Sequence, residues 1–139
     1  MKNNLALVLL DESASWKGES KVLAHWSEMN TPKNQKSIPL RVEETASQIK
    51  RDYLAWVYKL GLLKVNNESL ISRLKLFENF SFWWMTSISE KSPHKSVGIY
   101  QVFKLRALEK LYLETGCHGL IYCGNDVNLD QTLKHWCRK

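Results

Sequence analysis

The pattern of hydrophobic and polar positions begins with a short run that is apolar at every residue. This run covers residues 5–10 and is followed at once by Asp11 and Glu12. Apolar residues without alternation are typical of a strand in a parallel sheet, which is covered on both faces. Six residues are too few for a membrane span or for the apolar part of an export signal. The run therefore predicts a buried first strand.

Two longer segments space their apolar residues as a helix does. In residues 41–60 these residues recur at intervals of three and four, and Gly61 stands where a helix C-cap belongs. Ser96 can cap a second long helix that runs to Leu113, with Gly116 as its stop signal. A shorter helical pattern follows residues 66–67, and another follows Asn128, which resembles an N-cap. We therefore expect two long helices and two short ones.

Short apolar segments between these helices predict the remaining strands. Residues 119–123 and 62–65 fit strands, residues 21–26 fit a short helix or a strand, and residues 30–39, with two of the three prolines, fit a loop. Strands separated by helices imply crossover connections and a mostly parallel sheet. The pattern predicts an α/β fold, with one domain over residues 1–139 and a small sheet.

Charge favours anionic partners without defining a site for them. The chain has 20 Lys and Arg against 14 Asp and Glu, a formal net charge of +6. These cations are scattered and form no run of five or more, which favours a solvated basic surface over a dedicated anion site. No signature of an RNA-binding or helix-turn-helix module is present. Nucleic acid is therefore not indicated as a partner.

The cysteines indicate a reducing compartment. There are three, an odd number without a CxxC pair, which argues against a disulfide scaffold and fits the cytoplasm. Cys117, Cys123 and Cys137, taken with His118 and His135, match no common spacing of zinc ligands. Neither a GxGxxG fingerprint nor a P-loop occurs. We therefore expect neither a metal nor a cofactor.

The densest group of aromatic and charged residues lies in residues 81–96. Trp83 and Trp84 lie among Phe and Met, and indole faces of this kind can stack on sugar rings. Packing into a core followed by a solvated turn at Pro93 is the alternative explanation. The residue types alone leave both possibilities open.

Polar residues follow the aromatic ones within this segment. Glu90 or His94 can act as a general base towards a hydroxyl acceptor. Lys91 and Lys95 can contact an anion, helped by the N-terminus of the helix that begins at Ser96. Residues 81–96 therefore form the main candidate site.

Loops that follow the predicted strands form a second candidate region, because ligands of parallel sheets bind beyond the carboxyl ends of the strands. Residues 11–16 follow the first strand, and Gly124, Asn125 and Asp126 follow the last. The backbone around Asn125 can present amides to a phosphate at a helix N-terminus. A tight turn with a helix cap is the alternative.

A resemblance to a known family rests on three segments of the chain. These are Phe82-Trp83-Trp84-Met85-Thr86, Glu90-Lys91-Ser92-Pro93 and residues 100–109. Together they resemble a family of bacterial surface-carbohydrate biosynthesis proteins, which are similar to lipopolysaccharide or capsule glycosyltransferases with two Rossmann-like domains. The specific match covers about residues 79–111. The resemblance assigns no catalytic residue.

This resemblance implies a Rossmann-like three-layer domain that forms half of a two-domain glycosyltransferase. It implies a function in surface-polysaccharide synthesis, with a sugar, sugar-phosphate or nucleotide-sugar ligand. The chain is much shorter than such an enzyme, which suggests an N-terminal fragment, a truncated product or a half that pairs with a second domain or a second copy. Sugar transfer by the chain alone is not expected. The alternative is a non-catalytic interaction domain that pairs with another chain through its Trp-rich face.

Overall fold

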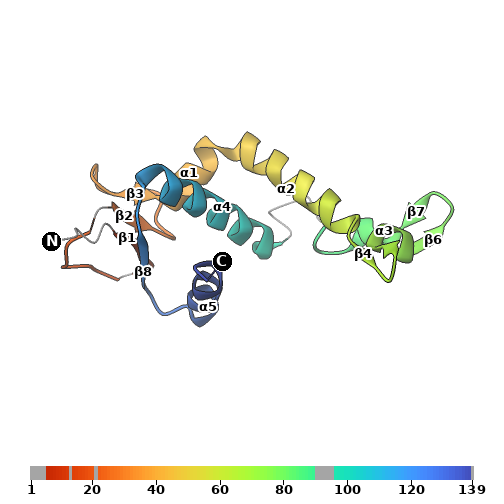
Figure 1. Ribbon diagram of the computed structural model, residues 1–139. Helices are drawn as coiled ribbons and strands as arrows, with labels where there is room; N and C mark the ends of the chain where they lie inside the picture. Colours follow the sequence, from red (N-terminus) through yellow and green to blue (C-terminus); the bar gives the residue numbers. More distant parts are fainter. Residues whose placement is uncertain (1–5, 13, 21, 90–95, 139) are drawn as a thin grey trace. The chain divides into compact units, whose positions relative to one another are not determined.

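The computed structural model describes residues 6–12, 14–20, 22–89 and 96–138 (Figure 1). The chain divides into two compact units. The first comprises Met1–Glu44 and Arg106–Lys139, and the second comprises Thr45–Leu105. The expectation of a single domain stays a prediction, and each unit is described by itself.

The first unit is built on a four-stranded sheet whose neighbouring strands are all parallel. Its strands are β1 (Ala6–Leu10), β2 (Val22–His25), β3 (Lys36–Ser37) and β8 (Gly119–Cys123), in the order β3-β2-β1-β8. Leu7 of β1 is in register with Val22 on one side and with Leu120 on the other. The chain leaves β1 towards β2 and returns through β8, so the strand order reverses at β1. The predicted α/β fold with a parallel sheet is confirmed.

Burial of β1 explains why its residues are apolar without alternation. Leu7, Val8 and Leu9 are all completely buried, although successive side chains of a strand point to opposite faces of the sheet. Both faces are therefore covered, as the sequence predicts. Residues 22–25, which fit a helix or a strand, form the neighbouring strand β2.

Three helices belong wholly or partly to the first unit. They are α1 (Ile38–Glu44), the second half of α4 (Val97–Thr115) and α5 (Val127–Trp136). Arg41 of α1 is paired with Glu114 of α4, and the rings of Tyr112 and Trp136 join α4 to α5 edge to face at 5.7 Å. Gly116 adopts φ 59°, a left-handed conformation that ends α4 where the sequence predicts a stop.

The second unit contains one long helix, two small hairpins and two short helices, together with the first half of α4. Its elements are α2 (Ala46–Gly61), β4 (Lys64–Val65), β5 (Glu68–Ser69), α3 (Leu70–Arg73), β6 (Lys75–Phe77), β7 (Phe80–Ser81) and the 3₁₀ helix η1 (Phe82–Met85). Each hairpin, β4–β5 and β6–β7, is an antiparallel pair. Tyr53, Val57, Trp83 and Ile99 form the buried centre of this unit.

The predicted helix over residues 41–60 is wrong at its N-terminal end. It consists of two helices, α1 and α2, separated by Thr45, and α1 already begins at Ile38 in the predicted loop. Proline is tolerated in a first helical turn, where amides lack an intrahelical acceptor. Pro39 stands in such a turn, and the Ser37 hydroxyl accepts a hydrogen bond from the Leu40 amide at 3.1 Å. At the other end, Gly61 is the last helical residue and the cap is Leu62.

Residues 62–81 also differ from their prediction. Asn66 and Asn67 adopt φ 53° and 66° and form the turn of a hairpin, so residues 64–65 add no strand to the parallel sheet. Asn tolerates this left-handed conformation better than most residues. The helical pattern after this turn yields only the four residues of α3 before the chain enters β6. Within the part of the chain that the structure describes, every helix is too short or too polar to cross a membrane.

Candidate functional site

Hydrogen bonds hold the aromatic half of the predicted site in place. The Ser81 hydroxyl donates to the carbonyl of Ile71 at 2.6 Å, which ties the start of η1 to α3. After η1, the Thr86 and Ser89 hydroxyls each donate to the carbonyl of Trp83 at 2.8 Å. The Tyr53 hydroxyl donates to the carbonyl of Ile88 at 2.7 Å, which fixes the following turn to α2. Residues 81–89 are thus a well-connected segment.

The two neighbouring tryptophans have opposite environments. Trp83 is only 3% exposed and lies in the centre of the second unit, whereas Trp84 is 43% exposed. A sugar ring can stack only on an accessible indole face. Trp84 is therefore the tryptophan of this pair that can contact a ligand, and Trp83 contributes to packing.

Trp84 lines a hollow of about 290 Å³, which we call the Trp84 hollow. Its other lining residues come from α3 and from the β6–β7 hairpin: Ile71, Ser72, Lys75, Glu78, Asn79, Phe80 and Ser81. One indole face is thus combined with an ammonium, a carboxylate, an amide and hydroxyl groups. This set can stack on a sugar ring, hydrogen-bond its hydroxyls and attract a phosphate.

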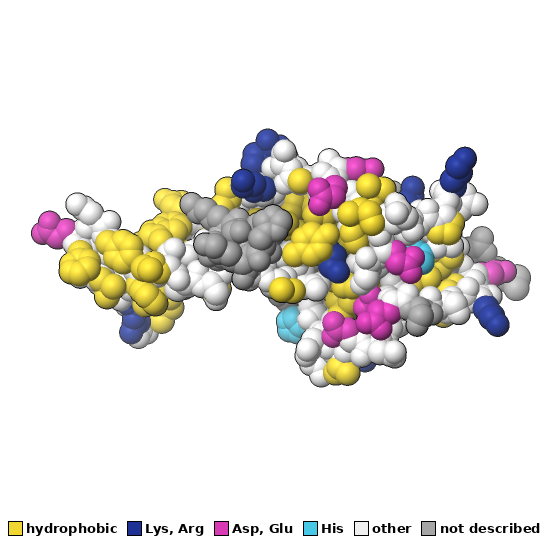
Figure 2. Space-filling view, turned by 180° about the vertical axis from the view of Figure 1, so that it is seen from behind, with side chains coloured by type: hydrophobic (Ala, Val, Ile, Leu, Met, Phe, Trp, Pro, Cys, Tyr) yellow, Lys and Arg dark blue, Asp and Glu magenta, His cyan; other side chains and the backbone are white. Residues whose placement is uncertain are grey.

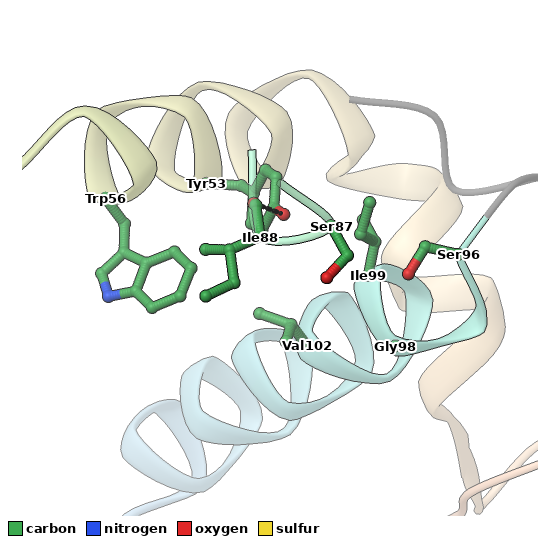
Figure 3. A pocket seen from close by; sticks show the side chains of 8 residues that line it. All are labelled: Tyr53, Trp56, Ser87, Ile88, Ser96, Gly98, Ile99 and Val102. Atoms are coloured by element: carbon green, nitrogen blue, oxygen red, sulfur yellow. Dashed lines mark hydrogen bonds between the residues drawn. The ribbon is translucent and has the colours of Figure 1, made fainter. Parts of the chain in front are cut away.

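Ser96 lies in a different hollow of the second unit, between α2 and the start of α4 (Figure 3). This Trp56 hollow has a volume of about 270 Å³ and is lined by Tyr53, Trp56, Ser87, Ile88, Ser96, Gly98, Ile99 and Val102. Figure 3 shows Trp56, Ile88 and Val102 at one end and the hydroxyls of Ser87 and Ser96 at the other. Its wall is mainly apolar, so it offers a sugar few hydrogen bonds. The structure does not bring Ser96 and Trp84 into one site.

The four charged or titratable residues of the predicted site lie outside the described residues. Glu90 and His94, the candidate general bases, belong to this group, as do Lys91 and Lys95, the candidate anion contacts. Their roles stay predictions. Asn125 is described and exposed, but it belongs to the first unit, where it follows β8.

A polar cluster lies at the carboxyl end of the sheet, where the strand order reverses. Asp11 follows β1 and is buried, with 8% exposed. Its carboxylate accepts hydrogen bonds from the Ser27 hydroxyl at 2.5 Å and, more weakly, from the Tyr122 hydroxyl at 3.5 Å. The Asp11 amide donates to the carbonyl of Cys123 at 3.0 Å. The loops after β1 and β8 are therefore adjacent, because these two strands are paired in the sheet.

Electrostatics at this cluster do not favour a phosphate. Burial raises the pKa of Tyr122, and the carboxylates of Asp11 and Asp126 raise it further, against the lowering effect of the hydrogen bond from the Asp126 amide. The Asp126 carboxylate caps α5 by accepting from the amides of Asn128 and Leu129 at 2.9 and 3.1 Å. Two of the first-turn amides that a phosphate would use are thus occupied by the Asp126 cap, and the role of Asn125 stays a prediction.

The prediction that Asn128 caps this helix is wrong. Asn128 is the second residue of α5, and Asp126 has the extended backbone, φ −77° and ψ 103°, that a capping residue needs. A carboxylate at this position also interacts favourably with the positive end of the helix dipole. Asp126 therefore takes the role that the sequence pattern assigned two residues later.

Gly124 is required by the close approach of Tyr122. A Cβ atom at residue 124 would lie 2.4 Å from the Tyr122 hydroxyl oxygen and 2.9 Å from the Asp11 Cβ. We expect Gly124→Ala to lower the free energy of unfolding by about 1–3 kcal/mol, because the Tyr122 ring must give up its hydrogen bonds. Urea denaturation followed by circular dichroism measures this change.

Gly98→Ala is the matched control for Gly124→Ala. Its Cβ would meet only the Ser96 hydroxyl oxygen, at 3.6 Å, and alanine favours a helix over glycine by roughly 1 kcal/mol. We expect Gly98→Ala to leave stability unchanged or raise it. Equal destabilisation by both substitutions would contradict the steric explanation.

Groups of side chains that could hold a metal ion are absent from the described residues. In residues 6–12, 14–20, 22–89 and 96–138, no three His, Cys, Asp or Glu side chains gather where they could hold a metal ion. All three cysteines are free thiols, with Cys117 buried, Cys123 half-buried and Cys137 exposed.

Sequence reasoning missed the polar residues that surround Trp84. Lys75, Glu78 and Asn79 come together because β6 and β7 form a hairpin with Glu78-Asn79 at its turn. The only local signal was a polar dipeptide between Phe77 and Phe80, and Glu-Asn is not one of the pairs that are typical of a two-residue hairpin connection. Ser27 and Tyr122 were missed as well, because pairing in the sheet brings them to Asp11.

Comparison of the chain with models of protein families, with curated proteins and with solved structures finds no match.

Proposed function

We propose that this chain binds a sugar or sugar phosphate, as a glycosyltransferase-like domain of bacterial surface-polysaccharide synthesis, and that the Trp84 hollow holds the sugar. The observation that carries the proposal is the half-exposed Trp84 beside Lys75, Glu78 and Asn79. The indole covers one face of the ring, Glu78 and Asn79 bond its hydroxyls, and Lys75 contacts the phosphate. The resemblance of residues 82–86 to surface-carbohydrate biosynthesis proteins supports the same ligand class.

The strand order supports a Rossmann-like interpretation of the first unit. The classic doubly wound sheet has the order 3-2-1-4 in its first four strands, and β3-β2-β1-β8 follows the same sequence of positions. In the described residues between β1 and β2, and between β2 and β3, the connections contain no helix. The first unit would therefore be a reduced form of the three-layer domain.

Removal of the Trp84 indole tests the proposed site. Wild-type protein is titrated with glucose 1-phosphate, UDP-glucose, glucose and inorganic phosphate by isothermal titration calorimetry, which does not depend on the indole as a reporter. We expect saturable binding of at least one sugar phosphate and a loss of affinity of about tenfold or more in Trp84→Ala. Trp56→Ala is the matched control, since Trp56 is 47% exposed and lines the other hollow.

A second variant separates sugar contacts from phosphate contacts. In Lys75→Gln, the preference for glucose 1-phosphate over glucose should disappear, because the ammonium is the cation of this hollow. Trp84→Ala should weaken both ligands alike. Equal loss in Trp56→Ala and Trp84→Ala would argue against the Trp84 hollow. Absence of binding to all four probes, with a concentration-dependent dimer in sedimentation, would favour the alternative of a non-catalytic interaction domain.

A further inference from the structure

The β6–β7 hairpin and η1 expose an unusual concentration of large hydrophobic side chains. We call these side chains the apolar tip: Leu76, Phe77, Phe80, Phe82, Trp84 and Met85. They occur within ten consecutive residues, and each is at least 36% exposed. Figure 2 shows hydrophobic side chains gathered over the end of the second unit at which Figure 1 labels β6 and β7. A contiguous apolar surface of this kind marks an interaction site.

Exposure of β6 on both of its faces indicates what covers the apolar tip. Every residue of β6 is exposed, although the side chains of a strand alternate between two faces, whereas Ser81 of the paired strand β7 is buried. Leu76 is 60% exposed and its neighbour Phe77 is 73% exposed. A protein partner that docks on one face of β6 leaves the other face in water. The boundary between lipid head groups and acyl chains can surround both faces of the strand.

Charge around the apolar tip fits an anionic surface. Residues 59–85, which contain the tip and the elements next to it, carry four exposed cations, Lys59, Lys64, Arg73 and Lys75. Two carboxylates, Glu68 and Glu78, oppose them, so this part of the chain has a formal charge of +2. Aromatic and aliphatic side chains bordered by cations are typical of segments that bind at the interface of anionic bilayers.

We propose that the apolar tip docks on the surface of a membrane that contains anionic lipids, with Leu76, Phe77 and Met85 inserted at the level of the head groups. The neighbouring lysines pair with lipid phosphates, with their aliphatic stems along the apolar boundary. This interaction goes beyond the proposed function, because it does not require a sugar. It also places the Trp84 hollow, which shares the hairpin, near the membrane surface.

Vesicle co-sedimentation tests this proposal with the full chain. Vesicles of phosphatidylethanolamine with phosphatidylglycerol are compared with vesicles of phosphatidylcholine alone. We expect binding to the anionic vesicles to be about tenfold stronger or more. Raising salt from 0.1 to 1 M, which shortens the Debye length from about 10 to 3 Å, should weaken binding without abolishing it.

Substitutions outside the Trp84 hollow separate the two parts of the interaction. Leu76→Ser with Phe77→Ser should weaken vesicle binding by about tenfold or more, and Lys59→Glu with Lys64→Glu should remove the preference for anionic vesicles. The control is Leu113→Ser with Val127→Ser, two exposed side chains of the first unit. Circular dichroism verifies that each variant is folded, and glucose 1-phosphate titration shows whether its sugar site is intact.

Several outcomes would overturn the proposal. Unchanged vesicle binding in the Leu76→Ser, Phe77→Ser variant would exclude the apolar tip as the docking element. Failure of the wild-type chain to bind either kind of vesicle would exclude the membrane. If it failed and instead formed a dimer that the same variant abolished, the tip would be an interface between copies of this chain.

Discussion

Trp83→Ala is expected to lower the free energy of unfolding by about 3–5 kcal/mol, which is typical of removing a buried aromatic side chain. Trp83 is 3% exposed and packs with Tyr53, Val57 and Ile99. Its indole also lies against the last turn of α2, where a Cβ atom at Gly61 would come within 2.8 Å of the indole nitrogen. The cavity left by the substitution is therefore bordered by elements that cannot all move inwards. Urea denaturation followed by far-ultraviolet circular dichroism measures the loss without relying on tryptophan emission.

Trp84→Ala provides a control one residue away. Trp84 is 43% exposed on the same 3₁₀ helix, so we expect its substitution to change stability by less than about 1 kcal/mol. We therefore expect different phenotypes for the two variants. Trp83→Ala should lose stability, whereas Trp84→Ala should lose affinity for the ligand. Comparable destabilisation in both variants would contradict the distinction between a packing and a binding tryptophan.

Leu9→Ala should cost about 2–5 kcal/mol, the second large effect on stability. Leu9 is completely buried in β1, and it is paired with Ala24 of β2 on one side and with Tyr122 of β8 on the other. Strands on both sides fix its position, so the sheet has little freedom to close over the space left by the isobutyl group. The change is read as a shift of the urea midpoint at constant slope.

Leu113→Ala makes the same chemical change on the surface of the same unit. Leu113 is 71% exposed on α4, and leucine and alanine both favour helices. We expect a change of less than about 0.5 kcal/mol. If Leu9→Ala were equally mild, β1 would not be the centre of the core.

The parts of the fold that the sequence predicts well are those whose own residues decide their structure. β1 is apolar throughout because it is covered on both faces, and α4 ends at Gly116 because glycine readily adopts φ 59°. Neither inference requires knowledge of a distant residue. The sequence pattern therefore identifies the parallel sheet and the long helices.

Residues 62–81 are harder to predict, because their elements are only two to four residues long. Leu70, Ile71 and Leu74 show helical spacing, but the helix stops after Arg73 and the chain turns into a hairpin. Contacts between residues that are not neighbours in sequence stabilise that arrangement, among them the hydrogen bond from the Ser81 hydroxyl to the carbonyl of Ile71, ten residues earlier. The spacing of apolar residues along the sequence gives no information about such a hydrogen bond.

The candidate site also has one part that the sequence predicts and one part that it does not. The sequence locates the aromatic segment, but it cannot tell which indole of Trp83-Trp84 faces the core, because a 3₁₀ helix directs neighbouring side chains to different sides. It also cannot place Lys75 beside Trp84, since the β6–β7 hairpin brings them together. The residue types predict the class of ligand, and the β6–β7 hairpin determines which side chains lie together in the Trp84 hollow.

Pairing between β1 and β8 has a consequence for the order in which the chain folds during synthesis. Ala6 is in register with Gly119, so one edge of β1 stays uncovered until roughly 110 further residues have been made. At about 5–20 residues per second, that interval lasts roughly 6–23 s. The second unit, Thr45–Leu105, is fully synthesised before this interval ends. We therefore expect the inserted unit to form first, and the apolar strand β1 to need protection from aggregation while the ribosome completes β8.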